Sequence, residues 1–251
     1  MTDDRSDAHT AVKPLTGRRA LITGGTTGIG RAIAVLLASE GARVFVCGRD
    51  PAHLNDALAR IRAVGEGDGV ALDLSDPAAM DQFVDQGCAW LGGLDVAVAN
   101  AAVGAGALGD MAADDLRYAI ATDFTAYLLF AHAALTKLDG KGDIVLTGSM
   151  SAHVLGPGST VYAGIEFGIQ GFAEALRREQ GPQGVRVTLV EPGLTGSNMI
   201  EKDEAAQREA IAKEEMLRAE DIAVGVHYAL TQPNRVVVQQ LTIAPRGVGE
   251  E

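Results

Sequence analysis

The sequence predicts one α/β domain in which helices cover both faces of a parallel sheet. Short apolar runs alternate with longer helical patterns from end to end, and most of the runs are almost continuously apolar. Such runs are typical of parallel strands that are buried on both faces. The chain has 251 residues and contains no linker, internal repeat or low-complexity block that would divide it. Single α/β domains commonly reach this length.

The elements follow one another in strict alternation. The apolar runs predict strands at 19–23, 43–47, 69–72, 94–99, 143–147, 185–190 and 236–243. The amphipathic patterns between them predict helices at 29–39, 51–63, 77–91, 114–138, 160–180 and 219–230. Because parallel strands joined by helices take right-handed crossovers, we expect a Rossmann-like doubly wound fold. Its seven parallel strands are expected in the order 3-2-1-4-5-6-7.

Two segments lie outside this alternation. Residues 1–14 are polar and aperiodic, which predicts a flexible N-terminal tail before a single domain at 15–251. The insert at 194–217 ends in the highly charged pattern "EKDEAAQREAIAKEEML" and lies at the carboxyl edge of the predicted sheet, where ligands bind in such folds. Two interpretations stay open for it: a solvated surface helix, or a mobile lid over a substrate.

Composition excludes several classes of partner. The net charge of −12 and the pI near 4.8 argue against nucleic acid and anionic membranes. No apolar run approaches the roughly 18 residues that span a bilayer. Cys47 and Cys88 lack metal-ligand spacing and no signal peptide is visible, so we expect reduced thiols in a cytoplasmic protein. The histidines are scattered, and no metal site is predicted.

A glycine-rich stretch, "TGGTTGIG" at 23–30, runs from the first strand directly into a helix. Gly24, Gly28 and Gly30 allow a tight turn and a close approach of the backbone. The free N–H groups at the start of the helix suit a pyrophosphate. We expect the whole loop to bind a cofactor, including Thr26, Thr27 and Ile29.

The spacing T-G-x-x-x-G-x-G resembles the short-chain dehydrogenase/reductase family, and five further motifs continue the resemblance in order. These are "LDL" with Asp73 and Leu74, "ANAA" with Asn100 and Ala101, "GSM" with Ser149, Tyr162 thirteen residues later, and "EPG" with Pro192 and Gly193. The resemblance implies that Asp73 touches the adenine and that Pro192 and Gly193 border the nicotinamide. It also implies cofactor contacts from Leu74, Asn100, Ala101, Tyr162 and Thr195.

The second strand ends in "VFVCGRD", which bears on the choice of cofactor. Gly48 stands where NAD-dependent relatives carry an acidic residue, and Arg49 follows it. The resemblance therefore implies NADP(H), because an arginine can bind the 2′-phosphate. Arg49 is the expected phosphate partner, with Arg31 as a second candidate. An inward-pointing Asp50 would weaken the preference.

The catalytic tetrad of the family is altered. Ser149 and Tyr162 match their motifs, but Glu166 replaces the lysine and Asp123 replaces the asparagine. A unit charge about 5 Å from a phenol, at an effective dielectric near 20, is worth roughly 3 kcal/mol. Tyr162 should therefore stay protonated at neutral pH and be a poor base for alcohol oxidation. Asp123 and Glu166, if close, are expected to share a proton.

Three functions are compatible with these residues. The first is a reductase that works mainly toward the alcohol, with Ser149 and Tyr162 polarising a carbonyl. The second is an imine or iminium reductase, in which Asp123 and Glu166 stabilise a cationic substrate. The third is a non-redox enzyme or an NADP-binding module. In a further, structural interpretation, Glu166 turns away to solvent.

The helices at 114–138 and 160–180 carry apolar residues on more than one face. One face can pack on the sheet, and the remainder suggests a second copy of the chain. Members of the family commonly pair these helices, so the resemblance implies a homodimer or homotetramer. Alternatively, the extra apolar surface lies under neighbouring loops.

Overall fold

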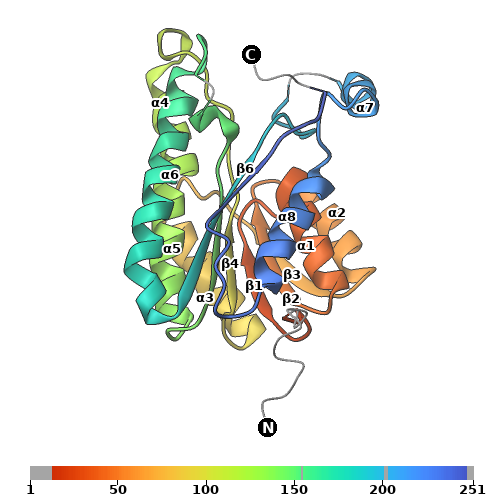
Figure 1. Ribbon diagram of the computed structural model, residues 1–251, viewed down its shortest axis with the longest axis vertical. Helices are drawn as coiled ribbons and strands as arrows, with labels where there is room; N and C mark the ends of the chain where they lie inside the picture. Colours follow the sequence, from red (N-terminus) through yellow and green to blue (C-terminus); the bar gives the residue numbers. More distant parts are fainter. Residues whose placement is uncertain (1–12, 154, 201–202, 248–251) are drawn as a thin grey trace.

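The computed structural model describes residues 13–153, 155–200 and 203–247, and it confirms the predicted sheet. Seven strands lie in the order β3-β2-β1-β4-β5-β6-β7, and every neighbouring pair is parallel (Figure 1). Their carboxyl ends therefore meet at one edge of the sheet. The strands are β1 (Arg19–Ile22), β2 (Arg43–Gly48), β3 (Glu66–Ala71), β4 (Val96–Ala99), β5 (Gly142–Thr147), β6 (Val185–Pro192) and β7 (Gln240–Ile243).

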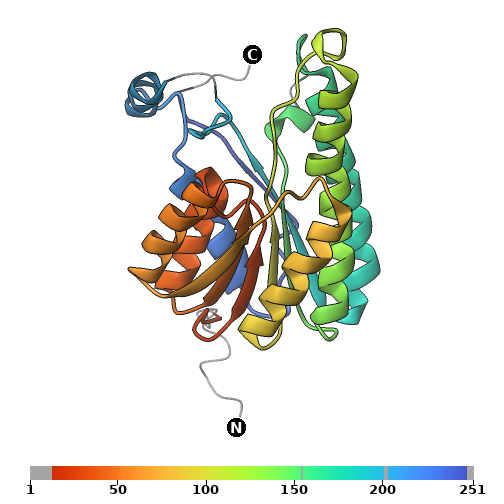
Figure 2. The same ribbon diagram turned by 180° about the vertical axis from the view of Figure 1, so that it is seen from behind.

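Helices cover both faces of the sheet (Figures 1 and 2). Helices α1 (Gly28–Ser39), α2 (Pro51–Arg62) and α8 (Ala219–Thr231) pack on one face. On the other face lie α3 (Pro77–Leu91), α5 (Ala126–Lys137) and α6 (Thr160–Gln180). Successive strand residues point to opposite faces, so Leu21 belongs to the second core while Ala20 and Ile22 belong to the first.

The edge strands differ from their predicted bounds. Strand β3 begins at Glu66, three residues before the predicted start, because an edge strand needs no apolar pattern. Gly67 and Gly69 also let it approach the side chains of Ile61 and Leu54. Strand β7 begins only at Gln240. The residues before it form a turn instead, in which the Val236 amide donates to the Pro233 carbonyl.

The predicted helix at 114–138 contains a π-helical turn. Helix α4 (Ala113–Ile120) continues through a π-helical segment (Ala121–Thr125) into α5. The π turn carries Asp123, which is 1% exposed and accepts a hydrogen bond from the Val103 amide at 2.7 Å. The extra residue in the turn changes which side chains face inward, and π turns occur frequently at functional sites.

This continuous helix, Ala113–Lys137, is long and apolar enough to cross a membrane by length and composition alone. No such run is expected from the sequence. Core helices of globular proteins share this length and composition, and 44% of the apolar window is buried inside the domain. Its own side chains Tyr127 and Phe130 pack into the core.

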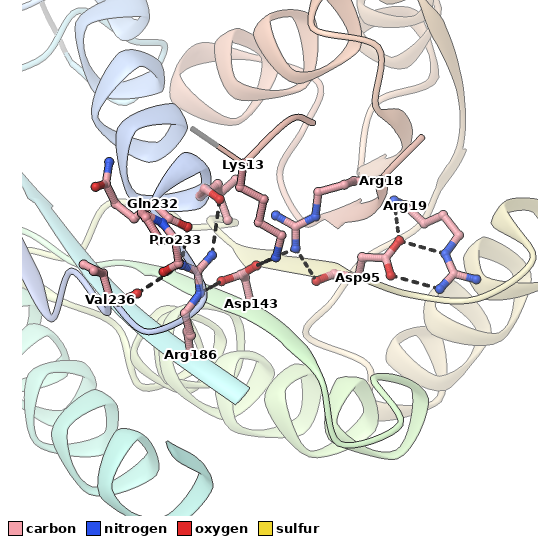
Figure 3. Close-up of polar contacts among 10 residues, drawn as sticks. Lys13, Arg18, Arg19, Asp95, Asp143, Arg186, Gln232, Pro233 and Val236 are labelled. Carbon is pink, nitrogen blue, oxygen red and sulfur yellow. Dashed lines mark hydrogen bonds and ion pairs between the residues drawn. The ribbon is translucent and has the colours of Figure 1, made fainter. Parts of the chain in front are cut away.

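A cluster of buried ions ties the amino-terminal edge of the sheet together (Figure 3). Asp143, at the start of β5, pairs with Arg18 and with Arg186, whose Nε lies 2.6 Å from the carboxylate. The Arg186 guanidinium also donates to the carbonyls of Leu230, Gln232, Pro233 and Val236 at 2.9–3.3 Å. The cluster thus joins three strands to the end of α8, at the edge opposite the carboxyl ends of the strands.

Two residues of the predicted tail, Lys13 and Pro14, lie within the described residues, and the Lys13 amide donates to the Thr231 carbonyl at 2.7 Å. The remainder of that predicted tail, residues 1–12, lies outside the described residues. In the insert at 194–217, a bridge between Thr195 and Leu217 closes the base, and α7 (Glu204–Ala212) projects beyond it. Residues 201 and 202 of the insert lie outside the described residues.

Candidate active site

A pocket of about 950 Å³ opens at the carboxyl ends of the strands. Loops that follow each of the first six strands contribute to its wall. Of the site residues predicted from the sequence, the pocket is lined by Gly24, Thr26, Thr27, Gly28, Ile29, Arg49, Asp73, Leu74, Asn100, Ala101, Ser149, Tyr162, Glu166, Pro192, Gly193 and Thr195. Gly30 and Asp123 lie behind the wall.

The glycine loop forms an anion site at the start of α1. Gly24 has φ +63° and Gly28 has φ +51°, and a Cβ on Gly24 would lie 2.7 Å from the Cα of Ala101. Thr27 caps α1 without a side-chain hydrogen bond, and no acidic residue lies in its first turn. The first N–H groups of the helix are therefore available to an anion. Gly30 has a supporting role, since a Cβ there would collide with the Gly24 carbonyl.

The end of β4 is fixed to this loop by Thr23. Its Oγ1 accepts hydrogen bonds from the amides of Asn100 at 2.9 Å and Ala101 at 3.1 Å. The Asn100 side-chain amide donates to the Gly24 carbonyl at 3.4 Å. The two segments that face the middle of the pocket are thus held as one unit.

Arg49 is exposed at the end of β2, and its guanidinium lies 5.5 Å from the centre of the Tyr118 ring. It donates to the Tyr118 hydroxyl, which in turn donates to the Asp73 carboxylate at 3.0 Å. Partial burial opposes ionisation of Asp73, but hydrogen bonds from Ser75 and Tyr118 and the charge of Arg49 together hold the Asp73 pKa below its usual value. A cation and an anion thus flank this end of the pocket.

The two other charged candidates near β2 make contacts of their own, although Asp50 also lines the pocket. Arg31 pairs with Asp56 at 2.8 Å and does not line the pocket. Asp50 caps α2 by accepting from the amides of Ala52 and His53 at 2.7 and 3.1 Å. It makes no ion pair with Arg49 among the described contacts, so Arg49 is the arginine at this site.

At the other end of the pocket, Tyr162 forms hydrogen bonds with the side chains of Ser149 and Glu166. Burial and then the charge of Glu166 raise the pKa of Tyr162 well above its usual value. The phenol is therefore protonated at neutral pH. Ser149 extends from the end of β5, and its Oγ accepts from the Ser151 amide at 3.1 Å.

Glu166 points inward and is 4% exposed, so the interpretation in which it turns to solvent is wrong. Burial, with smaller contributions from the charges of Asp123 and Glu191, raises the pKa of Glu166 to about 8, against a hydrogen bond from Tyr162. Burial likewise raises the pKa of Asp123 to about 7, against the hydrogen bond from the Val103 amide. Both groups thus bind protons near neutral pH, as buried carboxyls without a cation do.

Three residues of this end had no role in the sequence analysis. Tyr127 is buried and donates to the Thr147 carbonyl at 3.0 Å. Glu191, from the "EPG" motif, is 1% exposed and its Oε2 lies 2.9 Å from Nε2 of His153. No sequence pattern joins residues 153, 166 and 191, because the sheet and α6 bring them together from separate segments.

A glycine-lined anion site beside the switch point of a doubly wound sheet defines a dinucleotide-binding protein. A serine–tyrosine pair, Ser149 and Tyr162, lies at the far end of the same pocket. The family comparison agrees with this geometry: the model described as "short chain dehydrogenase" matches residues 18–208. The chain therefore belongs to the short-chain dehydrogenase family.

Relatives differ in how much of their length the chain spans. An uncharacterized oxidoreductase of Staphylococcus aureus strain MRSA252 is 29% identical over 234 residues, which are 92% of this chain and 98% of that protein. A glycine betaine reductase of Emericella nidulans is 31% identical over 247 residues, which are 93% of this chain but 19% of that protein. Among solved structures, a short chain dehydrogenase from Burkholderia cenocepacia in complex with NADP has a TM-score of 0.83 at 32% identity; the match covers 93% of this chain and 98% of that one.

Proposed function

We propose that the chain is an NADP(H)-dependent oxidoreductase that delivers hydride to a C=O or C=N bond of a small organic substrate, mainly in the direction of reduction. The observation that carries this proposal is Tyr162, a protonated phenol hydrogen-bonded to Ser149 and to a buried Glu166. A group that keeps its proton suits donation to a substrate and opposes removal of a proton from an alcohol.

The pocket fits a phosphorylated dinucleotide. The uncapped start of α1 and the glycines before it suit the pyrophosphate, and Asp73 suits the adenine. Arg49 stands alone among arginines and lysines in the described pocket wall and suits the 2′-phosphate, and the Burkholderia relative binds NADP. When bound, the reduced nicotinamide supplies the hydride.

The residues of the chain prepare the substrate for that transfer. The hydroxyls of Ser149 and Tyr162 both point to the same end of the pocket and would orient and polarise a carbonyl oxygen. Tyr162 then gives its proton to the oxygen as the carbon is reduced. Glu166 has a pKa of about 8 and so holds a proton at pH 7. Through its hydrogen bond, Glu166 can return a proton to Tyr162. The lysine of the family is not available here for this step.

A second candidate substrate class is an imine or iminium. Asp123 and Glu166 lie beside Tyr162, whereas the basic side chains of the described pocket wall, Arg49 and His53, come from the end of β2 and the first turn of α2. This end of the pocket thus favours positive charge. The Emericella relative is named for glycine betaine, a quaternary ammonium compound. Here the hydride would reach a carbon that is already electron-poor, and Tyr162 would orient rather than protonate.

The third function class is a non-redox enzyme or a binding module. One assay separates the three: loss of NADPH absorbance with panels of ketones, aldehydes and cyclic imines. Reduction of carbonyls that tolerates Glu166→Lys supports the carbonyl reductase. Turnover of imines that is lost in Asp123→Asn and Glu166→Gln supports the imine reductase. NADPH binding without turnover of any compound supports the binding module, and wild-type turnover in Tyr162→Phe refutes the role given to Tyr162.

We further propose a cytoplasmic homodimer or homotetramer formed through residues 114–138 and 160–180. Ile120 and Phe167 are 41% and 46% exposed on these helices, and an apolar hollow of about 500 Å³ lies between them. Sedimentation of the purified chain tests the assembly.

The first residues of the insert at 194–217, which include Ser197 and Met199, line the pocket and support its assignment as a substrate lid. Deleting α7 should then raise KM and leave NADPH affinity unchanged.

A further inference from the structure

Unpaired polar atoms concentrate at the catalytic end of the pocket. Among the residues that the structure describes, the buried side-chain oxygens without a hydrogen-bond partner include Asp123 Oδ2, Thr147 Oγ1, Glu166 Oε2 and Glu191 Oε1. Buried polar groups are almost always paired, so several unpaired oxygens in one place need an explanation. The mechanism above uses Glu166 and leaves Glu191 without a role.

Glu166 and Glu191 both approach Gly148. A Cβ built on Gly148 would lie 3.3 Å from Glu166 Oε2 and 3.6 Å from Glu191 Cγ. The missing side chain of this glycine therefore leaves a space that the Glu166 carboxyl and the Glu191 side chain both border, and the charge of Glu191 raises the pKa of Glu166. Each has one oxygen that no described group binds.

The other oxygen of Glu191 is connected to the surface. Glu191 Oε2 lies 2.9 Å from His153 Nε2, accepts from Thr242 Oγ1 at 3.2 Å and also accepts from the Gln240 side chain. Glu191 itself is 1% exposed, whereas the His153 side chain is 39% exposed. Neither residue is among those that line the pocket. The imidazole therefore meets solvent outside the space that cofactor and substrate occupy.

We propose that His153 and Glu191 form a proton route from solvent to Glu166 and Tyr162. This inference rests on the proposed reductase function. Each reduction of a carbonyl consumes one hydride from NADPH and one proton from solvent. Tyr162 gives its proton to the substrate oxygen and takes one from Glu166. Glu191 receives a proton from His153 Nε2 and, after its carboxyl group rotates, passes it to Glu166; solvent then reprotonates His153.

A route through the back of the site has a physical advantage. While product and cofactor fill the pocket, water reaches Tyr162 poorly from the front. The titratable groups that face Glu166 are Tyr162 on α6, Asp123 in the π turn, Tyr127 on α5 and Glu191 on β6. Of these, Glu191 has a hydrogen-bonded neighbour, His153, whose imidazole reaches solvent, and histidine side chains commonly serve as proton shuttles.

The test uses His153→Gln, which keeps a hydrogen-bond donor but cannot carry a proton. Thr242→Val is the matched control, because it removes a hydrogen bond to the same oxygen of Glu191 and no proton carrier. With NADPH and a carbonyl substrate from the panel, the first turnover of His153→Gln should stay within about twofold of wild type, because Tyr162 begins protonated. Later turnovers should slow by about tenfold or more, giving a burst that added imidazole abolishes. Thr242→Val should show no burst. The route would be overturned if the first turnover of His153→Gln slowed as much as its later turnovers, or if its steady-state rate equalled that of wild type.

A second measurement does not depend on turnover, so it separates this inference from the proposed function. In protein labelled with ¹³C at glutamate carboxyls, the Glu166 signal is assigned by its loss in Glu166→Gln. Its titration should move to lower pH in Glu191→Gln. It should also change in Gly148→Ala, which places a methyl group against the Glu166 carboxyl and the Glu191 side chain. An unchanged titration in both variants refutes the link between Glu166 and Glu191, whereas a link without any NADPH turnover refutes only the reductase.

Discussion

The Tyr162 hydroxyl is hydrogen-bonded to the Glu166 carboxyl, one turn further along α6. In this position the carboxyl opposes ionisation of the phenol, and the phenol favours a charged carboxyl. Burial decides between these tendencies, because it raises the pKa of both groups. The pair therefore stores two protons at neutral pH.

The first prediction concerns the pH dependence of reduction. Glu166 has a pKa of about 8. Above that pH its carboxylate is a negative charge next to the developing alkoxide and no longer returns a proton. We expect kcat/KM for a carbonyl substrate to fall as the pH rises through about 8. Glu166→Gln should remove this inflection while lowering kcat. An inflection that persists in the variant would assign it to another group.

The second prediction concerns stability. An unfolded glutamate has a pKa of about 4.3, so between that value and about 8 the folded protein binds more protons at Glu166 than the unfolded one. The free energy of unfolding therefore falls with rising pH across this window. Glu166→Gln removes this pH dependence. The free energy of unfolding of the variant minus that of wild type should therefore be greater at pH 8 than at pH 4.5, by on the order of 1–3 kcal/mol. Urea unfolding at the two pH values measures it. A smaller gain at pH 8 than at pH 4.5 would contradict the sign.

The third prediction concerns cofactor selectivity. Arg49 is the guanidinium assigned to the 2′-phosphate, and a hydrogen bond to a charged group contributes about 1.5–3 kcal/mol. Arg49→Ala should weaken NADPH binding by about 10–100-fold and leave NADH binding nearly unchanged. Energy transfer from Trp90 to bound nicotinamide provides a titration signal that needs no turnover. Arg31→Ala is the matched control, since Arg31 pairs with Asp56; an equal loss there would argue against Arg49.

The fourth prediction concerns the ion cluster of Figure 3. Asp143→Asn leaves Arg18 and Arg186 buried beside a neutral group. Removing one partner of a buried ion pair costs about 3–5 kcal/mol, so the urea midpoint should fall markedly. NADPH affinity should not change, because the cluster is at the opposite edge of the sheet. Asp114→Asn breaks an exposed pair with Arg117 and should leave the midpoint in place.

The sequence predicted the order of the strands and most of the pocket wall because these depend on local patterns. Apolar runs mark strands whatever surrounds them, and the glycine loop is contiguous. The π turn at Asp123 was missed, because the sequence from 114 to 138 reads as one helix and the extra residue depends on tertiary packing. The contact of Glu191 with His153 was missed for a related reason, since it joins residues 38 positions apart through the sheet. Likewise, neither arginine by itself showed that Arg49 lines the pocket while Arg31 pairs with Asp56.

The ion cluster at the amino-terminal edge also separates the residues that stabilise the fold from those that form the pocket. That edge fastens β1, β5, β6 and the end of α8 without any contribution from the pocket. At the opposite edge, the lysine of the family can therefore be replaced by a buried glutamate, and buried carboxyl oxygens can stay unpaired, while the fold remains stable. Because the two edges are separate, residues of the pocket can be substituted one at a time during evolution, and the reaction can change, without loss of the ion cluster that stabilises the fold.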